Sequence, residues 1–197
     1  MKKISLILVC LLLAASLFAV DVTIGGAAGI NGTFLTGLEE NKDTGLRAGF
    51  EVGAFANIAV NELFSVQPEL NFLLLRSGPK VENDVKSTLT AKIFEIPVLA
   101  KFSFNNFSVY LGPAVQILLG DLNAKMTYKG DEVFSIDGEP DNRVMFSGVA
   151  GIGYAVPMGN GSLSFDLRYR RQITELTEKD DSRFNTVSFR VGYGIGL

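Results

Sequence analysis

The sequence predicts an all-β fold, an eight-stranded antiparallel up-and-down barrel that crosses a membrane. Apolar and polar side chains alternate with a period of two from Val22 onward, and no stretch keeps the spacing of an amphipathic helix. Glycine is abundant, at 21 of 197 residues, which suits a narrow and strongly curved wall. This length fits one ordinary domain or a single barrel. We therefore expect one barrel domain over residues 20–197.

The first 19 residues have the pattern of a secretory signal peptide. Two lysines precede an apolar run from Ile4 to Leu13, and small residues follow it up to Asp21. The run is shorter than the roughly 18 residues of a spanning helix, so a retained anchor is the weaker alternative. Lipidation of Cys10 is a second minor alternative. Cleavage near Ala19 would remove the only cysteine, and no disulfide is then expected.

Composition excludes several classes of function. The chain has no histidine, which removes His-based acid/base catalysis, Ser-His and Cys-His nucleophile pairs and imidazole metal sites. A net charge of -3 offers no basic face for nucleic acid. We expect no catalytic residue, no metal, no cofactor and no nucleic-acid partner. Acid/base work by the paired carboxylates Glu51 and Glu69 is the alternative to a structural role for them.

The first four strands are predicted from rows of alternating residues. In Val22–Ile30 the contrast is mild, because glycine and alanine occupy both faces. In Leu46–Val60 every charge lies on one face, opposite an apolar row. Phe64–Leu74 sets Phe, Val and Leu against Ser, Gln, Glu and Asn, and Phe94–Phe104 sets its apolar row against Glu, Lys and Ser. Each segment therefore has one face without charges.

The last four strands follow the same rule. Phe107–Leu119 opposes its apolar row with Ser, Tyr, Gly and Gln, and Val144–Val156 opposes its row with Ser and Gly. Leu163–Tyr169 sets Leu, Phe and Tyr against Ser, Asp and Arg, and Val187–Leu197 alternates apolar residues with Ser, Arg and Gly. The rows are long enough for tilted strands that cross a bilayer.

Barrel size decides which face points outward. The interior of an eight-stranded barrel is filled by small and medium side chains, so apolar rows with most of the 15 Phe would not fit there. The apolar face is therefore expected to contact lipid. A soluble periplasmic lipid carrier, with the two faces reversed, is the less favoured alternative.

Connection lengths predict the orientation of the barrel. Tight turns are expected at Asn61-Glu62, Asn105-Asn106 and 157–161, whereas the other connections are long and polar: 36–45, 77–91, 120–142 and 175–184. In barrels of this kind short turns face the periplasm. We therefore expect the termini in the periplasm and the long loops outside the cell.

Three further features are predicted at the end of the barrel that carries the long connections. Asn31-Gly32 is a hairpin dipeptide, but too few residues follow it for a return strand, so the first strand is expected to continue. In the longest connection, 124–128 and 133–136 are expected to pair as a hairpin outside the membrane, where it could bind a partner. The loops are rich in acids, which predicts an acidic rim. Solvation is the favoured explanation of that rim, and cation bridging or host-ligand binding is the alternative.

Charged residues on the inward face predict the content of the lumen. Three carboxylates lie near mid-height on strands two to four, and three arginines lie near mid-height on strands seven and eight. Strands three and seven are opposite in an eight-stranded ring, and an unpaired charge there would cost several kcal/mol. We expect these groups to pair across the lumen and plug it, and a gated or weakly conducting pore is the alternative. The predicted lumen residues are Arg47, Glu51, Glu69, Glu95, Lys101, Asp166, Arg168, Arg170 and Arg190.

Two parts of the sequence resemble a known family. The stretch Phe94–Lys101 followed by Tyr110–Pro113, together with the C-terminal strand, is similar to small outer-membrane β-barrel proteins of the porin-like domain family, akin to OmpA- and OmpX-type barrels. The resemblance implies that the barrel assembly machinery reads a signal in the last strand. Its final residue departs from the family pattern, which most often ends in Phe. The residues of this signal are Arg190, Gly192, Ile195 and Leu197.

Two classes of function follow from these observations. The leading one is an integral outer-membrane protein with a largely plugged lumen and a structural or surface-interaction role. The alternative is a small-solute porin across the outer membrane. The expected partners are outer-membrane lipid, the assembly machinery during biogenesis, and a host or surface ligand at the loops. We expect a monomer.

Overall fold

The computed structural model describes residues 21–36, 44–79, 85–128, 131–138, 143–174 and 183–197. The predicted signal peptide lies outside these residues. No helix within them is long and apolar enough to cross a membrane. The strands are β1 (Val22–Thr36), β2 (Thr44–Ala59), β3 (Phe64–Pro79), β4 (Val85–Phe104), β5 (Phe107–Leu118), β6 (Leu122–Tyr128), β7 (Asp131–Gly138), β8 (Val144–Met158), β9 (Gly161–Gln172) and β10 (Arg183–Gly196).

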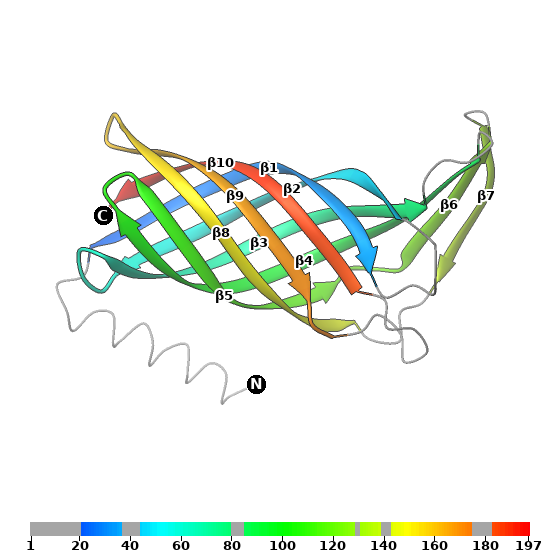
Figure 1. Ribbon diagram of the computed structural model, residues 1–197, viewed down its shortest axis with the longest axis horizontal. Coiled ribbons are helices and arrows are strands. Elements are labelled where there is room, and N and C mark those ends of the chain that lie inside the picture. The colour runs from blue at the N-terminus through cyan, green and yellow to red at the C-terminus, as the bar shows by residue number, and fades with distance from the viewer. Residues whose placement is uncertain (1–20, 37–43, 80–84, 129–130, 139–142, 175–182) are drawn as a thin grey trace.

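Eight of these strands form a closed antiparallel ring (Figure 1). Each pairs with its neighbours in the order β1, β2, β3, β4, β5, β8, β9 and β10, and β10 returns to pair with β1. The closing register runs from Thr23 opposite Gly196 to Thr36 opposite Arg183. The predicted eight-stranded up-and-down barrel is therefore confirmed. Closure leaves no free sheet edge within the ring.

The two faces of the wall differ as the alternation predicts. Along β5 and β10 exposed and buried residues alternate, and the exposed rows are apolar, as Val109, Leu111 and Phe189 illustrate. Ile30 and Phe107 are 68% and 65% exposed, whereas the inward Glu69 and Arg168 are each 2% exposed. The wall thus presents the apolar band that a membrane barrel requires, with the polar rows enclosed.

Tight turns join the strands at the end of the barrel that holds the C-terminus. The Asn61 side-chain oxygen accepts hydrogen bonds from the backbone N–H groups of Leu63 and Phe64, at 2.9 and 2.8 Å. Asn105 and Gly159 have φ angles of 55° and 61°, a left-handed conformation that asparagine and glycine tolerate best. All three turns lie where the sequence predicts them.

The opposite end of the barrel is more ordered than the sequence predicts. The expected loop at 77–91 is too long, because β3 continues to Pro79 and β4 starts at Val85. The predicted hairpin is confirmed, since β6 pairs with β7. In addition, β6 pairs with the extension of β4, from Val85 opposite Tyr128 to Thr90 opposite Asn123. Figure 1 shows β6 and β7 projecting beyond the ring.

The first strand continues past the Asn31-Gly32 dipeptide at this end of the barrel. β1 runs through Asn31-Gly32 without turning back, as expected, and ends at Thr36, where the first long connection is predicted to begin. Asn31 points into the lumen and is 4% exposed, and its amide donates to the Leu74 carbonyl at 3.4 Å. The strand therefore continues because both of its neighbours, β2 and β10, extend alongside it.

An apolar cluster fills part of the lumen, which the sequence analysis did not predict. Its members come from β3, β4, β5, β8 and β10, so they converge from several sides of the ring. They pack at the end of the lumen nearer to β6. The cluster consists of Leu73, Leu75, Ala91, Ile93, Leu118, Met145 and Phe184. Its sequence signal is the leucine run from 73 to 75, in which the alternation stops and both faces of β3 are apolar.

The topology predicts that the ring folds without the β6–β7 projection. Replacing residues 123–137 by a short Gly-Ser linker should preserve the shift in gel mobility on heating in detergent that marks a folded barrel. The reason is that the ring closes through the pairing of β4 with β5 and of β5 with β8, whereas β6 and β7 project from the extension of β4. Deleting β5 instead should abolish the shift, because β5 joins β4 to β8. Loss of the shift in the 123–137 variant would contradict this account.

Candidate functional site: the charge network in the lumen

Six charged side chains meet at mid-height in the lumen. Glu51, Glu69 and Glu95 project from β2, β3 and β4, and the arginines project from β9 and β10 across the ring. All six side chains are almost completely buried, with exposures of 0–3%. The alternation of each strand explains their position, because every second residue points inward. The arginines are Arg168, Arg170 and Arg190.

Glu69 is the most heavily bonded of the three carboxylates. The Arg168 guanidinium donates to both of its oxygens, each at 2.8 Å, in the bidentate geometry that favours Arg with carboxylate. Arg190 donates to Oε2 at 2.9 Å. The amides of Gln67 and Asn71 donate to it as well, at 2.7 and 2.9 Å. The ion pair from β3 to β9 thus joins opposite walls of the ring.

Arg170 connects the other two carboxylates. It donates to both oxygens of Glu51, at 2.7 and 3.1 Å, and through Nε to Glu95 at 3.0 Å. Arg190 Nε lies 3.3 Å from Glu51, so this arginine links Glu51 with Glu69. Gln116 donates to the remaining Glu95 oxygen at 2.8 Å. Three carboxylates and three guanidiniums are therefore joined in one network in which the formal charges cancel.

Tyr110 from β5 completes the network on one side. Its hydroxyl oxygen accepts from Arg168 Nε at 3.3 Å, and its ring centroid lies 5.1 Å from the guanidinium carbon. Gly151 on β8 makes room for the ring, since a Cβ there would lie 2.5 Å from it. The sequence places Tyr110 on the inward face but does not pair it with arginine. Only the register that puts Tyr110 opposite Gly151 identifies the contact.

The remaining three predicted lumen residues lie beside this network rather than within it. Lys101 donates to Gln67 at 3.2 Å, and Asp166 accepts from Ser164 at 3.4 Å. Both line a cavity of about 110 Å³ on the short-turn side of the arginines. Arg47 instead lines a larger cavity at the β6 end. Arg47 lies four residues beyond Glu51 on β2, toward the β6 end, where the β2–β3 register also shifts between Leu46 and Phe50.

The network leaves little chemistry for these carboxylates to perform. Each accepts hydrogen bonds from at least one arginine. Within the described part of the chain, no group of three or more Asp, Glu, Cys or His side chains is arranged to hold a metal ion. The three carboxylates are therefore held by arginine and amide donors from several strands.

The residues of the predicted assembly signal lie on the strand that closes the ring. Arg190 and Gly192 face inward, and Arg190 is part of the network. Ile195 and Leu197 are exposed on the outer face, at 45% and 81%. The Leu197 N–H donates to the Val22 carbonyl at 2.8 Å, next to the seam between β10 and β1. Recognition of this strand by the assembly machinery stays a prediction.

A closed ring of antiparallel strands with an apolar outer wall and a polar interior is the architecture of a transmembrane β-barrel. The chain belongs to the outer membrane protein beta-barrel domain family, whose model matches residues 17–178. It is therefore an outer-membrane β-barrel protein. No curated protein matches the chain.

Solved structures share this fold at low sequence identity. The chain is 18% identical to Ail, the attachment invasion locus protein of Yersinia pestis, with coverage of 89% of this chain and 99% of that one and a TM-score of 0.52. It is 13% identical to a major outer membrane protein of Thermus thermophilus, with coverage of 91% and 100% and a TM-score of 0.51. Ail has also been solved with the heparin analogue sucrose octasulfate, at 17% identity, coverage of 89% and 99% and a TM-score of 0.50.

Charge balance predicts how the network responds to mutation. Glu69→Gln removes one of three negative charges and leaves Arg168 without its bidentate partner. We expect the free energy of unfolding in lipid vesicles to fall by about 3–5 kcal/mol, the usual effect of leaving a charge buried without its partner. Urea titration followed by far-UV circular dichroism measures this change.

A matched double variant separates lost charge balance from lost packing. Glu69→Gln with Arg168→Met restores equal numbers of opposite charges, so it should be more stable than Glu69→Gln alone by at least about 1 kcal/mol. Arg143→Gln breaks an exposed pair with Asp121 at 3.5 Å and should change stability by no more than about 1 kcal/mol. Equal losses in the single and double lumen variants would contradict the network account.

Proposed function

We propose that this outer-membrane barrel has a closed lumen and serves a structural or surface-interaction role. The observation that carries the proposal is the buried network of three glutamates and three arginines, which joins opposite walls. The apolar cluster around Ile93 and Met145 supports it, because it occupies the lumen on the β6 side of the charges. Solute would have to displace both layers to pass.

A small-solute porin is the alternative, and the lumen offers little support for it. A porin keeps an aqueous channel lined by charges that remain hydrated. Here the arginines and glutamates are bonded to each other and to Gln116, Asn71 and Tyr110. An enzymatic role has equally little support, since the clustered ionisable groups are engaged in these ion pairs. A soluble lipid carrier would need the apolar rows inside, and they lie on the outer wall.

The orientation in the membrane forms part of the proposal. We place the short turns and both termini in the periplasm, and the β6–β7 projection outside the cell. The asymmetry between two- to four-residue turns at one end and long connections at the other supports it, since outer-membrane barrels have short periplasmic turns. The projection would then be the surface available to a partner. We also propose that the barrel acts as a monomer, because closure leaves the eight ring strands without an edge for pairing.

Conductance across planar lipid bilayers tests the closed lumen. The refolded protein, with its folded state checked by heat-dependent gel mobility, should give no steady ohmic current. An established porin inserted by the same protocol provides the positive control. A stable conductance that scales with salt concentration would contradict the closed lumen and favour the porin.

Epitope tags test the orientation. A tag inserted after Gly138, beyond β7, should bind antibody on intact cells. A tag inserted at Gly159-Asn160, in a short turn, should bind antibody only after the outer membrane is permeabilised. The reverse pattern would overturn the proposed orientation.

A further inference from the structure

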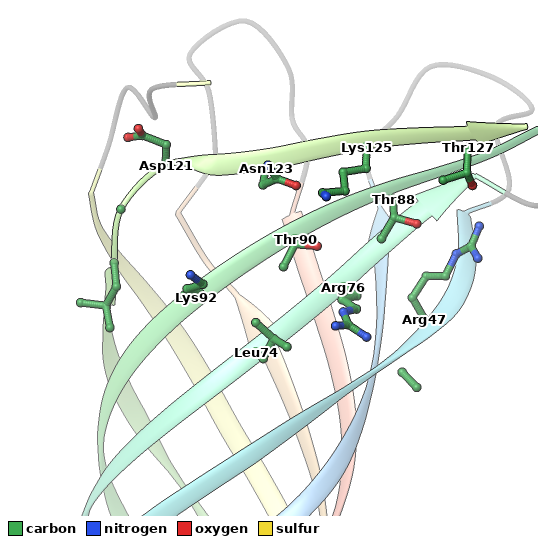
Figure 2. Close-up of a pocket in the computed structure, with 13 residues that line it drawn as sticks. Arg47, Leu74, Arg76, Thr88, Thr90, Lys92, Asp121, Asn123, Lys125 and Thr127 are labelled. Atoms are coloured by element: carbon green, nitrogen blue, oxygen red, sulfur yellow. The ribbon is translucent and has the colours of Figure 1, made fainter. Parts of the chain in front are cut away.

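A basic pocket lies on the outer wall of the barrel at the β6 end. Its volume is about 980 Å³, and β2, β3, β4 and β6 contribute most of its lining. Figure 2 shows the labelled side chains of these strands around one shared space. The lining contains four cations, Arg47, Arg76, Lys92 and Lys125, and three threonines that can donate hydroxyl hydrogen bonds.

Strand alternation places this pocket outside the lumen. On β3 the inward residues are Leu73, Leu75 and Ser77, all buried, so Leu74 and Arg76 point outward. Leu74 pairs with Lys92 and Arg76 pairs with Thr90 across β3 and β4. Both Arg76 and Lys92 are exposed. The pocket is therefore open to what surrounds the barrel rather than to anything inside it.

The pocket begins where the apolar band ends. Phe72 and Phe94 are partners on the outer wall, and the Phe50 ring lies 6.2 Å from the Phe72 ring. The next outward pair toward β6 combines Leu74 with Lys92, and the pair after that combines Arg76 with a threonine. Aromatic rings mark the boundary of the hydrocarbon region in membrane barrels. Lys92 and Arg76 belong to the next two outward residue pairs beyond these rings, so they lie at the level of the lipid head groups.

Charge in the pocket favours an anion with several oxygens. Asp121 is the single acid among the described residues of the lining, and it is paired with Arg143 at 3.5 Å. Arginine and lysine at a membrane surface bind phosphate through charge-assisted hydrogen bonds, and threonine hydroxyls can donate to the same oxygens. Leu74 and Leu119 add apolar surface on which an acyl chain could rest.

We propose that this pocket binds the phosphate groups of a lipid head group in the membrane leaflet at the β6 end. The lipid would be a partner for the surface role proposed above. The leaflet at the β6 end is the outer one if the barrel has the proposed orientation, so this part rests on the proposed function. The lipid supplies the phosphates to Arg76 and Lys92 while its chains continue along the apolar wall below. A soluble polyanion has no acyl chains to contact the apolar wall next to the cations, so it would use only part of this surface.

Native mass spectrometry of the folded barrel in detergent tests the proposal. The probes are bis-phosphorylated lipid A, the same lipid with both phosphates removed, and sucrose octasulfate as a soluble polyanion. The intact protein should retain the phosphorylated lipid about tenfold better than the dephosphorylated form, the equivalent of one lost charge-assisted contact. Retention should weaken with added salt.

Variants locate the binding on the protein. Arg76→Gln and Lys92→Gln should each reduce retention of the phosphorylated lipid about tenfold, and Arg76→Lys should keep most of it. Arg171→Gln removes an exposed cation from β9, across the ring, and should leave retention unchanged. Each variant is first shown to be folded by its heat-dependent gel mobility.

Three outcomes would overturn the proposal. They are equal retention of phosphorylated and dephosphorylated lipid, unchanged retention in Arg76→Gln and Lys92→Gln, or binding of sucrose octasulfate at these residues without binding of the lipid. The assay needs neither a closed lumen nor a membrane orientation. Its failure is therefore distinguishable from failure of the conductance or epitope-tag experiments.

Discussion

Charge compensation inside a narrow ring is the constraint on which the rest of this structure depends. Hydrocarbon outside the wall requires an apolar outer face, and the alternation of a strand then directs its polar residues into a small, closed interior. Charges held there are shielded from water, so each must find an opposite partner. Arg168 and Arg190 on Glu69, with Arg170 between Glu51 and Glu95, satisfy this requirement for all six groups.

The same ion pairs brace the barrel mechanically. Neighbouring strands are joined by backbone hydrogen bonds, but only side chains can join β3 to β9 across the lumen. The pair between Glu69 and Arg168 does so in two parallel hydrogen bonds of 2.8 Å. Small residues make this packing possible, as Gly151 does for the Tyr110 ring beside Arg168. The ion pairs and the packing around Tyr110 thus depend on the same inward-facing rows of the strands.

The sequence predicts the ring well because hydrocarbon imposes a strict rule on it. Wherever the strands cross the membrane, a period of two identifies the outer face, and this suffices to place Glu69 and Arg168 inside and opposite each other. Beyond the membrane the rule lapses. In the extension of β4, threonine points outward and Leu89 and Ala91 point inward. The outward row is therefore polar rather than apolar, and the apolar outer row by which the other strands are recognised does not reveal the pairing with β6. Alternation also does not give height along the strand, and Arg47 lies four residues beyond Glu51 on β2, where it lines the cavity at the β6 end.

Side-chain NMR of the arginines in lipid nanodiscs tests the central claim most directly. If Arg168, Arg170 and Arg190 are held by carboxylates in a closed lumen, their Nη–H groups should give resolved signals that exchange slowly with water. Exposed Arg171 provides the reference for free rotation and rapid exchange. Rapid exchange and averaged Nη–H signals for the three lumen arginines would contradict the account.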